Sequence, residues 1–228
     1  MSFTRRHLPH WIPEETPVFV TWRLAGSLPR QAAPWDRPSF CVVCPSAAKG
    51  EKRTDDEKRS SVPLTLLRQD AQLDRTTSGP FWLSDPCVAS VVGNALVHGG
   101  TACALYDLHA WAIMPNHVHA ILQPRCEMAA IMQWIKGRSG RVANRILGRS
   151  GAPFWQDESF DHWVRSAEEL EGLIEYVENN PVKAGLVRSK QEWRWSSAGA
   201  AQPESACSAV TVTKGAADAG QEGILRGD

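Results

Sequence analysis

The sequence predicts an α+β protein in which an antiparallel sheet has helices packed on one face. Two patterns indicate this class: segments with the two-residue alternation of strands, and segments with the spacing of amphipathic helices. They follow one another as strand, helix, strand, strand, helix, strand and helix, with no internal repeat. A chain of 228 residues is long enough for one domain with a substantial core.

The N-terminal half is expected to supply one strand and two helices. Residues 16–24 (TPVFVTWRL) alternate between two faces and predict a strand. Residues 63–73 predict a helix. A second helix is predicted over residues 85–98, because Asp85 is suited to the N-cap and a Gly-Gly pair directly after residue 98 is a typical stop.

A predicted hairpin and a basic helix follow. Residues 104–114 (ALYDLHAWAIM) and 117–122 (HVHAIL) both predict strands, and the Pro-Asn pair between them is a turn signal. Residues 128–147 predict a helix. The net charge of the whole chain is zero, but residues 129–149 contain basic side chains and no acidic ones, as a nucleic-acid-binding surface would.

The last two predicted elements are a short strand and an amphipathic helix. Residues 159–165 (SFDHWVR) predict the strand. The helix opens at Ser166, where the sequence SAEE forms a capping box with Glu169. We expect this helix to end before Pro181, because the residue that precedes a proline avoids the helical backbone conformation.

These elements are expected to form one domain from residues 1–33 and 63–198. Residues 34–62 are rich in proline, serine and charged side chains and predict a flexible insertion. Residues 199–228 are rich in alanine, glycine and serine without periodicity and predict a disordered tail. The N-terminus lacks the apolar core of a signal peptide, and no apolar run approaches the roughly 18–20 residues that span a bilayer, so we expect a cytoplasmic protein that does not enter membranes.

The first chemical signal is the pair of histidines in His117-Val118-His119. Successive side chains of a strand point to opposite faces, so the two imidazoles share one face while the valine points away. Two imidazoles with a third ligand nearby are typical of a divalent-metal site. The pattern alone is equally compatible with two ordinary histidines on a polar strand face.

The second signal lies on the last helix, where Asn180 follows Tyr176 by one turn on the same face. The tyrosine is a candidate nucleophile, and the amide oxygen is a candidate metal ligand. The alternative is a packing tyrosine and an asparagine that caps the helix. A tyrosine hydroxyl has a pKa near 10, so its attack on a phosphodiester would need a metal that draws charge from the phosphate. The resulting phosphotyrosine would retain the energy of the broken bond, so such an enzyme could rejoin as well as cut.

Taken together, these segments resemble the REP-associated tyrosine transposases, within the single-tyrosine HUH (IS200-like) transposase family. The resemblance rests mainly on residues 111–122 (WAIMPNHVHAIL) and 176–186 (YVENNPVKAGL), with support from residues 154–156 (FWQ) and 161–162 (DH). It extends over residues 5–197, apart from the insertion.

The resemblance implies a ferredoxin-like sheet and a transposase that nicks single-stranded DNA hairpins of repetitive extragenic palindromes and transfers the strand. It implies that His117 and His119 bind Mg²⁺ or Mn²⁺ and that Tyr176 becomes linked to a 5′-phosphate. Asn180 stands where related enzymes place a third ligand, and the adjacent Asn179 is its competitor. A monomer or a homodimer associated with the nucleoid is expected.

DNA contacts are expected from basic side chains on the helix over residues 128–147 and near the N-terminus. Such contacts to phosphates would make binding sensitive to salt. A solvated helix face is the alternative. The candidate residues are Lys136, Arg138, Arg141, Arg145, Arg5 and Arg6.

Three other functions fit parts of the pattern. A histidine-triad nucleotide hydrolase would need a third histidine where this chain has Ile121. A catalytically silent or domesticated hairpin-DNA-binding protein would carry the same fold without the reaction. A metallohydrolase that activates water would leave no covalent adduct between protein and DNA.

Overall fold

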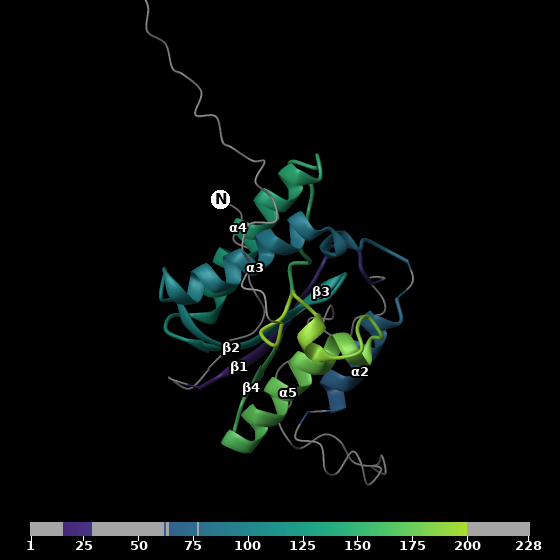
Figure 1. Ribbon diagram of the computed structural model, residues 1–228. Helices are drawn as coiled ribbons and strands as arrows, with labels where there is room; N and C mark the ends of the chain where they lie inside the picture. The colour runs from purple at the N-terminus through teal and green to yellow at the C-terminus, as the bar shows by residue number, and fades with distance from the viewer. Residues whose placement is uncertain (1–15, 29–61, 63, 77, 200–228) are drawn as a thin grey trace, which may run out of the picture.

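Four strands form one antiparallel sheet in the order β2-β3-β1-β4. The computed structural model describes residues 16–28, 62, 64–76 and 78–199 (Figure 1). The strands are β1 (Val18–Arg23), β2 (Tyr106–Ile113), β3 (His117–Pro124) and β4 (Phe160–Trp163). All four predicted strands are therefore confirmed, and β2 pairs with β3 as the predicted hairpin.

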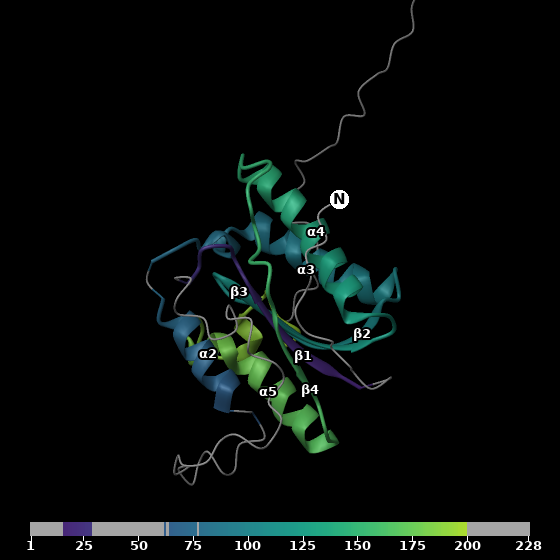
Figure 2. The same cartoon turned by 180° about the vertical axis from the view of Figure 1, so that it is seen from behind.

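The helices lie on both faces of this sheet (Figures 1 and 2). Helices α3 (Pro86–Thr101) and α4 (Met128–Ile146) pack together with the side chains of β1 at Val18, Val20 and Trp22. Helices α5 (Ala167–Lys183) and α2 (Leu64–Asp74) lie on the other side of the sheet.

The sequence β1-α3-β2-β3-α4-β4, with this strand order, is the ferredoxin-like arrangement, so the predicted α+β class and sheet are confirmed. The expectation of helices on one face holds only for α3 and α4, the two helices of that unit. It is wrong for α5, whose Leu173, Tyr176 and Val177 pack against Phe19 and other residues of the opposite face. The two central strands, β1 and β3, are thus buried on both faces of the sheet.

Helix α3 begins as predicted and ends later than predicted. The Asp85 side chain accepts a hydrogen bond from the backbone N–H of Cys87 at 2.8 Å, which confirms the N-cap. The Gly99-Gly100 pair does not end the helix, which continues to Thr101. Gly99 serves packing instead, because a Cβ there would collide with the Tyr106 hydroxyl.

Helix α5 also extends past its predicted end. The N-cap half of its capping box is confirmed, because Ser166 Oγ accepts a hydrogen bond from the backbone N–H of Glu169 at 3.2 Å. The return bond differs, since Glu169 Oε2 accepts from the backbone N–H of Arg165, at 2.7 Å, rather than from that of Ser166. The expected stop before Pro181 is wrong, since the helix continues to Lys183. A proline has a φ angle compatible with a helix; it removes its own N–H donor and its ring crowds the carbonyl four residues earlier, and here it lies only two residues before the end of the helix. The ladder continues to the C-cap after the proline, where Ala184 N donates to the Asn180 carbonyl at 2.9 Å.

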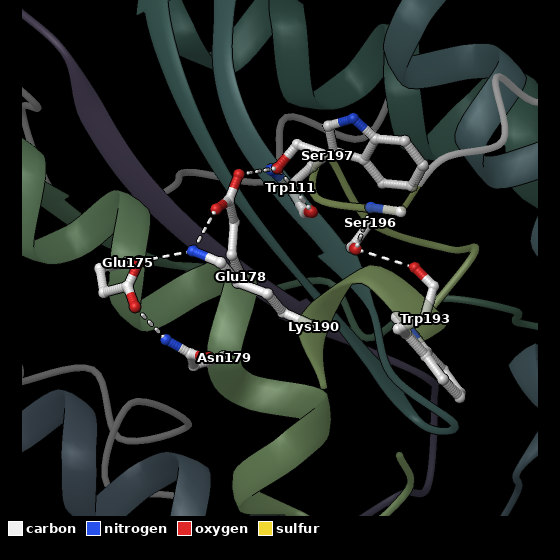
Figure 3. Close-up of polar contacts among 9 residues, drawn as sticks. Trp111, Glu175, Glu178, Asn179, Lys190, Trp193, Ser196 and Ser197 are labelled. Carbon is white, nitrogen blue, oxygen red and sulfur yellow. Dashed lines mark hydrogen bonds and ion pairs between the residues drawn. The ribbon is translucent and has the colours of Figure 1, made fainter. Parts of the chain in front are cut away.

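The chain after α5 covers the outer edge of β2. Residues 193–197, the edge segment, pair with this strand: Ile113 N donates to the Trp195 carbonyl at 2.8 Å, and Ser197 N donates to the Trp111 carbonyl at 2.9 Å. Figure 3 shows how Lys190, in the short helix η3 (Lys190–Glu192), ties this part of the chain to α5 through glutamates of that helix.

No helix among the described residues is long and apolar enough to cross a membrane. The predicted insertion and tail lie outside the described residues, except for residues 62 and 199. Arg5 and Arg6 lie outside them as well.

Candidate functional site

Five polar side chains from three elements meet on the α5 side of the sheet. His117 and His119 come from β3, Tyr176 and Asn180 from α5, and Asp70 from α2. All five are buried. The sheet register explains the histidines: Thr21 and Arg23 of the central strand β1 are their partners, so both imidazoles point away from α3 and α4.

The two histidines direct the same ring nitrogen toward one point. His117 Nε2 lies 2.9 Å from His119 Nε2. The other nitrogen of each ring is engaged, because His117 Nδ1 lies 2.6 Å from Asn116 Oδ1 and His119 Nδ1 lies 2.8 Å from Thr21 Oγ1. When Nδ1 carries the hydrogen in each ring, both Nε2 atoms present a lone pair, which is the arrangement of metal-binding histidines.

Both imidazoles are neutral at physiological pH. Burial lowers the pKa of His117 to about 3, with a further decrease from the neighbouring His119. Burial also lowers the pKa of His119 to about 3, helped by the positive charge of Lys183. Neutral imidazole is the form that binds metal ions, so the burial of this pair favours a ligand role.

Asp70 connects the histidines to the helix that carries the tyrosine. Its Oδ2 accepts hydrogen bonds from the Tyr176 hydroxyl and, at 3.1 Å, from Asn180 Nδ2. The same oxygen lies 3.5 Å from His119 Nε2. Burial raises the pKa of the Asp70 carboxyl. Its Oδ1 is buried and has no hydrogen-bond partner among the described residues.

Asn180 presents a second buried oxygen of this kind. Its Nδ2 lies 3.3 Å from His119 Nε2, while its Oδ1 has no hydrogen-bond partner in the described part of the chain. The neighbouring Asn179 points elsewhere, because its Nδ2 donates to Glu175 Oε1 at 2.5 Å (Figure 3). The geometry therefore favours Asn180 over its competitor as a member of the cluster.

The donor atoms of the cluster fit a divalent cation. Ligand atoms of Asp70, His117 and His119 lie within 4.8 Å of one another. Buried polar atoms in proteins are nearly always satisfied, and here two buried oxygens lack a partner beside two imidazole lone pairs. A cation with nitrogen and oxygen ligands would satisfy the two imidazole nitrogens and an oxygen of Asp70.

Tyr176 lies beside this cluster and is 4% exposed. Its ring centroid lies 6.5 Å from that of His119 and 6.4 Å from that of Phe19. Burial, together with the adjacent charge of Asp70, raises the pKa of the Tyr176 hydroxyl. The hydroxyl is thus protonated and donates its hydrogen to the carboxylate.

Sequence reasoning does not identify Asp70. It belongs to a predicted amphipathic helix, and no spacing relates position 70 to the histidines or to the tyrosine. The contact is purely tertiary, since α2 lies far from β3 and α5 in the chain. The only available signal in the sequence is an acidic residue on the apolar face of the predicted helix, where such a residue is unusual.

The predicted DNA-binding residues of α4 lie on the opposite side of the sheet from this cluster (Figures 1 and 2). Three of them, the α4 arginines, are exposed: Arg138, Arg141 and Arg145. Lys136 is engaged with the protein itself, because its Nζ donates to the carbonyl oxygens of residues 156, 157 and 158 at 3.1, 3.0 and 3.3 Å.

Comparisons with known proteins identify similar sequences. Residues 100–180 match the family described as "Transposase IS200 like". This segment runs from the end of α3 to Asn180 and includes His117, His119 and Tyr176. The REP-associated tyrosine transposase of Escherichia coli (strain K12) is 24% identical over 93 residues, which are 40% of this chain and 53% of that protein. The chain thus spans about half the length of this relative. These sequence matches confirm the resemblance to REP-associated transposases.

Among solved structures, a REP-associated tyrosine transposase bound to a REP hairpin is similar. It matches with a TM-score of 0.43 and 16% sequence identity, over 83% of this chain and 80% of that chain.

Proposed function

We propose, from the match of residues 100–180 to IS200-like transposases, that this chain is a metal-dependent transposase that cuts and rejoins single-stranded hairpin DNA through a covalent 5′-phosphotyrosine. One observation carries the proposal. Tyr176 and Asn180 meet His117 and His119 in one buried cluster, although these pairs lie more than fifty residues apart in the chain. A packing tyrosine and unrelated strand histidines would have no reason to share a polar cluster.

The metal set in this proposal consists of His117, His119 and Asn180, with Asp70 as a further oxygen donor. Mg²⁺ and Mn²⁺ both accept carboxylate and amide oxygens. When bound, such an ion would draw negative charge from the non-bridging oxygens of a phosphodiester and orient it for in-line attack.

The protein's own groups prepare the tyrosine. Asp70 Oδ2 accepts the hydrogen of the Tyr176 hydroxyl, which holds the phenol oxygen at the cluster. In the cutting step, a bond forms between the phenol oxygen and phosphorus, and the bond from phosphorus to the 3′ oxygen breaks. Asp70 is placed to take the phenol proton, and the departing 3′ oxygen takes a proton from water and ends as a hydroxyl. The reverse sequence would join a 3′-hydroxyl to the 5′-phosphate held on the tyrosine.

Contacts to DNA phosphates are proposed for the α4 arginines, and for Arg5 and Arg6, whereas Lys136 is engaged with carbonyl oxygens of the protein itself. The α4 arginines are exposed and lie on the face of the sheet away from Tyr176. DNA that contacts both α4 and Tyr176 therefore has to pass an edge of the sheet. A hairpin, with a stem and a single-stranded flank, is a substrate long enough to do so.

The test is a denaturing gel of the protein with a labelled single-stranded hairpin and Mg²⁺ or Mn²⁺. A slowly migrating covalent band that requires metal and disappears in Tyr176→Phe is expected. The chain contains only one other tyrosine, so Tyr106→Phe is a matched control that should keep the band. Tyr106 is buried and donates to the Leu96 carbonyl at 2.7 Å, away from the cluster.

Two outcomes would overturn the proposal. Cleaved DNA without an adduct, unaffected by Tyr176→Phe, would indicate a hydrolase that activates water. Hairpins that are bound and never cut, with either metal, would indicate a binding protein without the reaction.

A further inference from the structure

Lys183 places an ammonium group directly over the ring of Tyr176. It is the last residue of α5, seven positions after the tyrosine, so two turns of helix put both side chains on one face. Its Nζ lies 4.1 Å from the centroid of the tyrosine ring. The Lys183 side chain is exposed, whereas the tyrosine beneath it is buried. A molecule that approaches Tyr176 over this side therefore meets Lys183.

This ammonium has no polar partner within the described ranges: no hydrogen bond or ion pair to Lys183 occurs there. The contrast with Lys190 is clear, because Lys190 Nζ lies 2.6 Å from Glu175 Oε2 and 3.0 Å from Glu178 Oε2 (Figure 3). Partial burial lowers the pKa of Lys183, against the opposing effect of nearby carboxylates. The three N–H donors of Lys183 remain available to an anion.

We propose that Lys183 is a catalytic residue that binds a non-bridging oxygen of the phosphate attacked by Tyr176. The inference rests on the proposed function. The phosphorus becomes bonded to the phenol oxygen, so the phosphate has to lie at the ring that Lys183 already covers. The exposed lysine supplies positive charge at the ring, in addition to a cation bound by the buried histidines and Asp70. It gives up no proton: the new bond joins phenol oxygen to phosphorus, Asp70 takes the phenol proton, and the departing 3′ oxygen takes a proton from water to become a hydroxyl.

The rate of adduct formation in a single turnover tests this role. Lys183→Met should slow the adduct by at least about tenfold, because the group would stabilise charge on the reacting phosphate. Lys183→Arg, which keeps the charge and the donors, should recover most of the rate. Lys190→Met removes the same charge seven residues further on and should change the rate less than about threefold, because that lysine is engaged by two glutamates.

A second measurement separates phosphate binding from a structural role. The cleavage site is first mapped from the Tyr176 adduct, and a hairpin is then made with an uncharged methylphosphonate at that linkage. Binding is measured in the Tyr176→Phe background, where no adduct forms. The neutral linkage should weaken binding when Lys183 is present and should have no further effect in Lys183→Met, because the two changes remove one and the same contact.

The outcomes distinguish this inference from the proposed function. If the wild-type protein forms the adduct and Lys183→Met forms it equally fast, or if the two losses of affinity simply add, the role of Lys183 is refuted while the nucleophile stands. If no variant forms an adduct, the proposed function itself fails. If Lys183→Met is unfolded by circular dichroism, Lys183→Arg with the methylphosphonate hairpin decides instead. The neutral linkage should weaken the binding of this variant as it does with lysine, and an unchanged affinity would refute the contact.

Discussion

Replacement of Asp70 by asparagine tests the metal set most directly, because it removes a charge and keeps the shape of the side chain. Asp70 is 3% exposed, and its Oδ1 has no hydrogen-bond partner within the described residues. Its Oδ2 accepts from Tyr176 and Asn180. Asparagine retains one oxygen acceptor but loses the negative charge that would face a divalent cation.

The magnitude follows from these contacts. Loss of an oxygen ligand or of a group that supports the ligands lowers metal affinity by about 10–100-fold, which corresponds to roughly 1.4–2.8 kcal/mol. The fold should be affected much less. One altered hydrogen bond contributes about 1 kcal/mol, and this changes the midpoint of thermal unfolding by about 2–4 °C in a domain of this size.

The assay is titration calorimetry of Mn²⁺ into protein freed of metal with EDTA, combined with thermal unfolding without metal. Asp107→Asn is a matched control, because Asp107 is an exposed aspartate of β2 that pairs with Arg125. It should leave Mn²⁺ affinity unchanged. An Asp70→Asn protein that unfolds normally and binds Mn²⁺ within twofold of the wild type would refute the inclusion of Asp70 in the metal set.

Three further predictions concern the fold and the DNA surface. Gly99→Ala should lower the free energy of unfolding by about 1–3 kcal/mol in urea titrations, because a Cβ there collides with Tyr106. Its control is Gly137→Ala on α4, where the added Cβ meets open space and the substitution should be neutral or stabilising. Equal effects of the two substitutions would contradict the packing argument. The slope of log affinity against log salt concentration for hairpin binding should become about 2–3 less steep when all three α4 arginines are replaced by glutamine. An unchanged slope would show that these arginines do not contact DNA phosphates. Lys136→Met should lower the free energy of unfolding by about 1–3 kcal/mol, since its three carbonyl partners lose their donor; a reduced salt slope with unchanged stability would instead indicate a contact to DNA.

The parts of this molecule that were predictable from sequence are those set by local chemistry. The alternation around His117 and His119 places both imidazoles on one face of any strand, and the structure has them so. The spacing of Tyr176 and Asn180 places them one turn apart on any helix. Caps such as Ser166 are local as well, and the predicted N-cap bond of Ser166 is confirmed.

The parts that were not predictable depend on contacts between distant segments. The periodicity of α5 shows that the helix has an apolar face, but it contains nothing that selects one face of the sheet over the other. Asp70 enters the cluster only because α2 packs beside α5. The glycine pair at the end of α3 looks like a stop in sequence, and its role in packing against Tyr106 becomes visible only in three dimensions.

The edge segment determines how this sheet can associate with other chains. An uncovered edge strand exposes a row of backbone donors and acceptors that can template pairing with another molecule. Here the β2 edge is already occupied by residues 193–197, so a second copy could add a strand there only by displacing the chain's own. The other edge is β4, a strand of four residues. Any homodimer built by continuing the sheet would therefore have to form across this short strand, and one built elsewhere would rely on side chains rather than on backbone pairing.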